Sequence, residues 1–257
     1  MTWVVGGKHV FCARALSDVQ VTLTYPDGTK RYSNSVKKVH EIGPGVTILF
    51  ADSIKLAFAI IEDLRINFYP TIDPRTFEAP KEIMRRLVKH IKFYFKKHQS
   101  HNKERVEFLV FISPTGIFTE FGMWKLTSPS FQLIERDKPF SMLELGSGSV
   151  LKDYRKIVNK NSTGFYLVDD PEGGLPAAVV PLGKVALEYI FAEALEFKNA
   201  GISLPMHITG ITHQGVYIKE LPEIPDGDFP VVANSWKELQ KLLGKKGISL
   251  AECFASA

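Results

Sequence analysis

The order of the predicted secondary structure constrains this fold more than any other feature of the sequence. Strand patterns come in blocks, and pairs of helical patterns separate one block from the next. A sheet built from parallel βαβ units needs strands and helices that alternate one by one, so the block order favours antiparallel sheets covered by helices. The sequence therefore predicts an α+β fold.

Periodicity and capping residues place the individual elements. Asp52 or Ser53 can cap a first helix, and Ser235 can cap a short helix near the C-terminal end. Apolar residues at helical spacing predict helices over about 52–67, from residue 80 onward and over about 182–199. Strand patterns cover residues 2–5, 10–18, 106–113, 117–121, 131–135, 142–145, 206–211 and 216–221.

Composition narrows the class of protein and of partner. The 257 residues suit one large domain or two small ones. No apolar run approaches the ~18–20 residues of a membrane span. The net charge of +4 is too small to indicate binding to nucleic acid. Lys8 and His9 interrupt any signal peptide. Cys12 and Cys253 stand far apart rather than in a disulfide framework. We therefore expect a cytoplasmic protein with no membrane or nucleic-acid partner, and the spacing of the histidines predicts no metal site.

Thr2 is the first candidate for chemistry. A small side chain directly behind Met1 permits removal of that methionine, which leaves Thr2 with a free α-amine and a hydroxyl on one residue. An α-amine has a pKa of about 7.7–8.0, so it can accept a proton near neutral pH and serve as the base for its own hydroxyl. Threonine is also a common second residue, and from Thr2 alone that plain interpretation stays open.

Four motifs follow Thr2 along the chain. Ser17-Asp18 ends a strand pattern, a lysine pair occupies 37–38, a strand over 45–51 leads into a helix, and Gly-Ser-Gly follows the strand at 142–145. In this order the chain resembles the proteasome β-subunit family of N-terminal-nucleophile hydrolases, including bacterial proteasome-related proteases. The resemblance covers roughly residues 2–221, and it rests on the shared order because each motif is short.

The resemblance implies a fold and an assembly. It implies a four-layer αββα sandwich, in which two stacked, mainly antiparallel sheets lie between layers of helices. Residues 1–221 would form this hydrolase domain, and residues 222–257 would form a C-terminal extension with a short helix, whose role is not assigned. Because members of the family assemble into rings or spirals, a homo-oligomer is expected. Neither the ring size nor an ATPase partner follows from the sequence.

The resemblance also implies roles for four residues. Thr2 would be the nucleophile, Asp18 and Lys38 would set the electrostatics around it, and Ser147 would hydrogen-bond its amine. Neighbouring residues on a strand point to opposite faces, so Lys37 and Lys38 cannot both face Thr2, and Lys38 matches the family pattern better. A dinucleotide-binding loop is a weaker interpretation of Gly146-Ser147-Gly148, because residue 151 is leucine and no βαβ unit surrounds the turn.

Two departures from the family pattern bear on activity. Asp52 and Ser53 stand where a glycine-rich turn usually supplies a backbone N–H to the oxyanion, and the Asp52 carboxylate would oppose negative charge there. The alternative is that Asp52 serves only as a helix cap. After the last long helix, Asn199 and Ser203 stand where the family often has aspartate and serine.

The function that follows is an N-terminal-threonine hydrolase of peptide bonds, which forms an acyl ester on Thr2 and needs no cofactor. Its substrate would be a peptide or protein. A degenerate subunit with a scaffolding or binding role is the alternative that Asp52 and Ser53 favour, and an amidase for a small molecule is a third possibility.

Overall fold

The structure is a computed structural model, and it describes most of the chain. The described residues are 2–8, 12–114, 121–135, 141–162, 166–168, 177–179, 187, 190, 192–194, 196, 205–212, 215–221 and 228–256. The strand predicted over 117–121, the helix predicted over about 182–199, and the candidates Asn199 and Ser203 lie wholly or largely outside them.

The first sheet contains the strand that follows Thr2. Its five antiparallel strands run in the order β10-β1-β2-β13-β14. They are β10 (Met142–Leu145), β1 (Val4–Lys8), β2 (Ala13–Asp18), β13 (Met206–Thr212) and β14 (Gly215–Leu221). β2, which ends in Asp18, lies at the centre, so the candidate aspartate is held by neighbours on both sides.

The second sheet packs against the first. Its five strands run in the antiparallel order β5-β6-β7-β8-β9. They are β5 (Val39–Gly43), β6 (Val46–Asp52), β7 (Val106–Ile112), β8 (Gly122–Thr127) and β9 (Ile134–Glu135). The chain leaves β6 for α1 (Ile54–Asp63), continues through a π-helical turn (Leu64–Phe68) and two 3-10 turns (Tyr69–Thr71 and Pro74–Glu78), and then forms α2 (Pro80–His98).

A third sheet joins distant parts of the chain. β3 (Gln20–Thr24) pairs with β4 (Lys30–Asn34) on one side and with β15 (Phe254–Ser256) on the other. The C-terminal segment also carries α5 (Trp236–Lys245), which Ser235 caps as predicted. Two short strands, β11 (Tyr166–Val168) and β12 (Ala177–Val179), pair separately.

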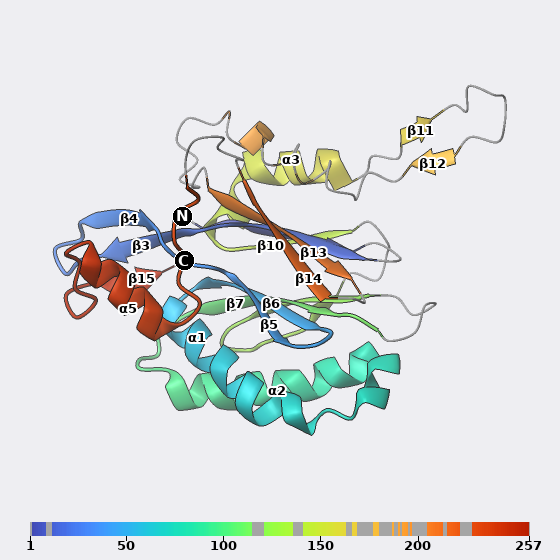
Figure 1. Ribbon diagram of the computed structural model, residues 1–257, viewed down its shortest axis with the longest axis horizontal. Helices are drawn as coiled ribbons and strands as arrows, with labels where there is room; N and C mark the ends of the chain where they lie inside the picture. The colour runs from blue at the N-terminus through green and yellow to red at the C-terminus, as the bar shows by residue number, and fades with distance from the viewer. Residues whose placement is uncertain are drawn as a thin grey trace.

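Apolar packing fills three zones. Val4, Leu49, Leu109 and other apolar side chains pack between the two five-stranded sheets. On the far side of the second sheet, α1 and α2 bury a larger cluster, and α3 (Lys152–Ser162) covers the first sheet (Figure 1). Within the described parts of the chain, every helix is too short or too polar to cross a membrane.

The predicted fold class is wrong. Instead of two sheets between complete helix layers, the described residues form three principal antiparallel sheets of five, three and five strands, and more of them lie in strands than in helices. The third sheet escaped prediction because β15 is short and its partner β3 lies near the other end of the chain. Sequence patterns predict single strands, whereas partners so distant are chosen by tertiary packing.

Candidate functional site

Thr2 is held by the turn that follows β10. The residue is 1% exposed and lies just before β1. Its backbone N–H donates to Ser147 Oγ at 3.1 Å, and its carbonyl accepts from the Gly148 N–H at 2.9 Å. Gly146 opens this turn with φ +80°, and a Cβ atom there would lie 2.5 Å from the Thr2 carbonyl oxygen. Only glycine suits both the conformation and the close approach.

Lys38 joins Thr2 to Asp18. The Lys38 ammonium donates to Thr2 Oγ1 at 3.1 Å and to Asp18 Oδ1 at 2.7 Å, and all three residues are buried. Asp18 also accepts from the backbone N–H groups of Trp3 and Gln20, each at 3.3 Å. The Asp18 carboxylate therefore accepts hydrogen bonds from several donors, as a buried charge must.

Burial acts on the ionisation of this cluster. Desolvation lowers the pKa of Lys38, and the neighbouring Asp18 carboxylate opposes that change. Burial and the same carboxylate raise the pKa of Tyr154 to about 12, so this ring remains neutral while it stacks on Trp3 with centroids 4.5 Å apart. The positive charge of an ammonium that donates to a hydroxyl favours the alkoxide form of that hydroxyl.

The two neighbouring lysines have different surroundings. The Lys38 ammonium contacts both Thr2 and Asp18, whereas Lys37 is half-buried. The backbone carbonyl of Lys37 accepts from His40 Nε2 at 2.8 Å. The structure thus brings together four of the sequence candidates, Thr2, Asp18, Lys38 and Ser147.

Of the two residues predicted to cap the first helix, the structure confirms Ser53. Ser53, not Asp52, caps α1, and its Oγ accepts from the Leu56 N–H at 3.4 Å. The Ser53 N–H donates to the Arg105 carbonyl at 3.0 Å, so it is already used. Asp52 has φ +73°, a left-handed conformation that costs a non-glycine residue free energy. The interpretation of Asp52 as a helix cap is therefore wrong.

The Asp52 carboxyl is partly buried and lies near charges of both signs. Burial, followed by the charge of Glu107, raises the pKa of Asp52 to about 6, although Lys125 and Arg105 act in the opposite direction.

The backbone N–H of Asp52 points away from β7, because successive N–H groups on an antiparallel strand point to opposite sides. It faces the same side as the Phe50 N–H, which donates to the Lys38 carbonyl.

Sequence reasoning missed Glu107. Its Oε2 accepts from the Gly146 N–H at 2.7 Å, and its Oε1 lies 3.1 Å from Lys125 Nζ and accepts from Thr127 Oγ1 at 3.0 Å. One signal was present in the sequence, since Glu107 is the single charged residue in the apolar run 106–112.

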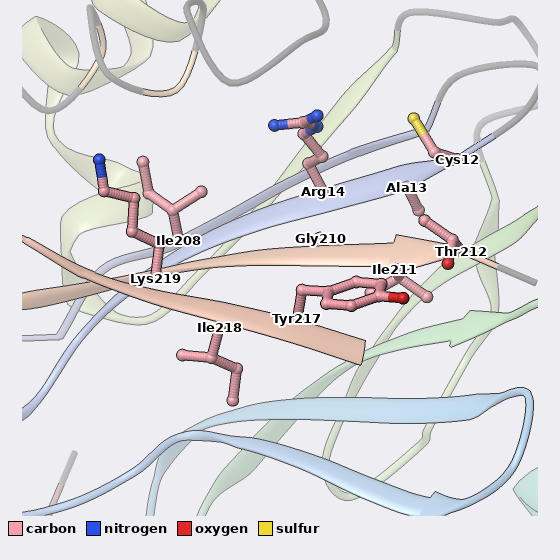
Figure 2. Close-up of a pocket in the computed structure, with 10 residues that line it drawn as sticks. All are labelled: Cys12, Ala13, Arg14, Ile208, Gly210, Ile211, Thr212, Tyr217, Ile218 and Lys219. Atoms are coloured by element: carbon pink, nitrogen blue, oxygen red, sulfur yellow. The ribbon is translucent and has the colours of Figure 1, made fainter. Parts of the chain in front are cut away.

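A pocket of about 300 Å³ lies away from this cluster, on strands β2, β13 and β14. In Figure 2, Arg14, Ile208 and Lys219 project from one side of these strands and Ile218 from the other. Thr2, Asp18 and Lys38 do not line it. Among the residues that the structure describes, no three histidine, cysteine, aspartate or glutamate side chains are placed to hold a metal ion.

Comparison with known proteins gives a likeness of fold. No protein-family model and no curated protein matches the sequence. Among solved structures, Anbu (ancestral beta-subunit) from Yersinia bercovieri has a TM-score of 0.60 and 15% identity, over 95% of this chain and 94% of that chain. A mutant of Anbu from Hyphomicrobium sp. strain MC1 has a TM-score of 0.58 and 14% identity, over 96% and 94%.

These findings correct the family assignment made from the sequence. Membership of the proteasome β-subunit family is not supported, because no family model matches and the two Anbu structures described above are only 15% and 14% identical to this chain. Short motifs in a shared order reflect a shared arrangement of strands, which distant sequences can adopt. The chain is similar in fold to Anbu, the ancestral β-subunit, at an identity that shows the fold alone.

Proposed function

We propose that this chain is an N-terminal-threonine hydrolase that cleaves an amide bond of a peptide. The observation that carries the proposal is the buried contact of Lys38 Nζ with Thr2 Oγ1 at 3.1 Å and with Asp18 Oδ1 at 2.7 Å. If Lys38 and Asp18 formed only a structural ion pair, they would not need the hydroxyl of Thr2, the residue directly behind Met1, as a third member.

The reaction would proceed through an ester on Thr2. Thr2 Oγ1 attacks the carbonyl carbon of the scissile bond, and its proton passes to the α-amine. The C–N bond then breaks, and the leaving amine takes that proton. Water attacks the ester, the acid product leaves, and the hydroxyl re-forms. Lys38 makes the alkoxide less costly, because its positive charge lies beside the oxygen.

The mechanism requires that the bond before Thr2 be cleaved. The nitrogen of Thr2 then becomes an α-amine, and Ser147 Oγ, which accepts from this nitrogen at 3.1 Å, would orient it. The Asp52 N–H is the candidate donor to the oxyanion, since the Ser53 N–H already donates to Arg105. At this turn, the Asp52 N–H could therefore donate to an oxyanion, whereas the Ser53 N–H could not.

The test combines mass spectrometry with kinetics. Intact mass should show the loss of Met1, and the purified chain should release the fluorophore from neutral fluorogenic peptides. Thr2→Ala should abolish this activity, and Thr2→Ser should retain part of it because the hydroxyl and the α-amine remain. Thr29→Ala, on the exposed turn between β3 and β4, is the matched control. Hydrolysis by a chain that keeps Met1 would exclude the mechanism.

A second candidate is a degenerate subunit with a binding or scaffolding role. The strained Asp52, with φ +73° and a carboxyl beside the donor that an oxyanion needs, favours it. A chain that has lost Met1 and remains inert toward peptides and small amides, both as wild type and as Asp52→Gly, would support this second candidate over the first.

A further inference from the structure

Glu107 connects the second sheet to the turn that holds Thr2. Its carboxylate is 13% exposed on β7, and its Oε2 accepts from the Gly146 N–H at 2.7 Å. Gly146 directly follows β10, which belongs to the first sheet. The contact therefore spans two sheets and ends at the residue that opens the 146–148 turn.

That turn touches Thr2 at three points. Ser147 Oγ accepts from the Thr2 N–H, the Gly148 N–H donates to the Thr2 carbonyl, and Gly146 passes so close that a Cβ would lie 2.5 Å from the same carbonyl oxygen. A displacement of Gly146 would therefore be transmitted to the backbone of Thr2. A near-attack geometry tolerates little such displacement, since misplacement by about 1 Å can cost roughly a hundredfold in rate.

The bond between Glu107 and Gly146 is of a strong type. A backbone N–H that donates to a carboxylate makes a charge-assisted hydrogen bond, which is shorter and roughly twice as strong as a neutral one. The Lys125 ammonium balances the charge at 3.1 Å, and it also donates to the Glu144 carbonyl at 2.8 Å, at the end of β10. Two bonds from the second sheet thus fix the point at which the turn begins.

We propose that Glu107 is a positioning residue for Thr2, which acts through Gly146 and the 146–148 turn. Its effect on catalysis rests on the proposed hydrolase function, whereas its hold on the turn does not. The competing explanation is that Glu107 serves only to pair Lys125 and Thr127 within the second sheet. Thr127→Val separates the two explanations, because it removes the Thr127 bond to Oε1 and leaves the Gly146 bond to Oε2.

The first experiment measures amide hydrogen exchange by NMR on the full chain. In Glu107→Ala, the Gly146 and Gly148 amides should exchange at least about tenfold faster than in wild type, since a bond to a charged group is lost. Glu107→Gln keeps an oxygen that can accept, so it should recover most of the protection. Thr127→Val should leave both amides unchanged. Should Glu107→Ala fail to fold, Glu107→Asp, which is one methylene shorter, carries the same expectation.

The second experiment measures peptide hydrolysis by the same variants. Glu107→Ala should lower kcat by about tenfold to a hundredfold with little change in KM, because the turn contacts Thr2 rather than the substrate. Thr127→Val should keep the wild-type kcat. Unchanged exchange at Gly146 and Gly148 in Glu107→Ala would overturn the proposal, even if the wild type is active. If Glu107→Ala exchanges faster than wild type but the wild type and all variants are inert, Glu107 does position the turn. That result would reject the hydrolase function instead.

Discussion

At the scale of the residue, charge burial governs the site. Lys38 and Asp18 are both 0% exposed, and each would be costly to bury alone. Together they present one ammonium to Thr2 Oγ1. The pair thus serves both the fold and the proposed chemistry.

Lys38→Met should destabilise the chain by about 3–5 kcal/mol, because it leaves the Asp18 carboxylate buried without its cation. The double variant Lys38→Met/Asp18→Asn should recover a large part of this loss, although it should remain inactive. Urea unfolding followed by circular dichroism measures both free energies of unfolding. If Lys38→Met were as stable as the wild type, the expectation would be wrong, and water would have to reach the Asp18 carboxylate.

Asp52→Gly should stabilise the chain at neutral pH. Glycine adopts φ +73° without the cost of about 1 kcal/mol that a side chain incurs there. The pKa of Asp52 is also raised from 3.8 to about 6, so between these values the folded chain holds a proton that the unfolded chain has lost. The free energy of unfolding of the wild type therefore falls as pH rises through this window, by on the order of 1–3 kcal/mol for a partly exposed group.

The measurement is urea unfolding at pH 4, 5, 6 and 7. Relative to wild type, Asp52→Gly should gain stability as pH rises toward 6 and keep that gain at pH 7. Asp52→Asn is the control, since it removes the charge but not the strain, and should show the pH-dependent part alone. Parallel profiles for all three chains would mean that Asp52 does not titrate near pH 6.

In activity assays, Asp52→Gly should raise kcat. The Asp52 carboxylate would lie near the negative charge of the oxyanion, and like charges a few ångströms apart cost on the order of 1–4 kcal/mol.

At the scale of the element, the start of α1 fixes the turn beside the site. Ser53 caps the helix with its side chain and bonds Arg105 with its backbone N–H, so this one residue links the end of β6 to the start of α1. The position of Asp52 depends on both bonds.

Ser53→Ala should lower the free energy of unfolding by about 0.5–2 kcal/mol through loss of the cap. The backbone bond to Arg105 needs no side chain, so the turn should persist and activity should change little. Thermal unfolding and the peptide assay measure the two effects. A loss of activity out of proportion to the loss of stability would contradict this division of roles, and it would assign the Ser53 hydroxyl to the site.

The sequence predicted single helices and strands better than the contacts between the two sheets. Strands over 142–145 and 106–113, the helix from residue 80 and the cap at Ser235 match the structure, because local periodicity and capping determine them. The family resemblance implied that Thr2, Asp18, Lys38 and Ser147 share one site, and the structure brings these residues together. Glu107 escaped notice because its contact with Gly146 depends on how two sheets pack.

At the scale of the whole molecule, the helical layer over the second sheet exposes apolar side chains. Ile66, in the turn after α1, is 62% exposed, and Phe93, on α2, is 63% exposed. A homo-oligomer of the kind that the sequence resemblance implies would cover both side chains if its subunits met at this layer. We propose that copies of this chain assemble through this layer.

Light scattering at micromolar concentration should therefore report a mass several times that of one chain. Phe93→Glu should shift it toward a single chain, because a charge would be buried at the contact. Val231→Glu is the matched control, since Val231 is exposed but lies in the C-terminal segment. A wild type that remains a single chain across a hundredfold range of concentration would contradict the assembly.

The pairing of β15 with β3 has a consequence for the order of synthesis. β3 follows Asp18 almost directly and leaves the ribosome early, whereas β15 emerges only after every other described strand. Until then one edge of β3 has no partner, and an unpaired edge can capture strands of other chains. Pairings so distant along the chain also form slowly. Translation speed and chaperone supply should therefore affect the yield of this protein more than the stability of its finished fold.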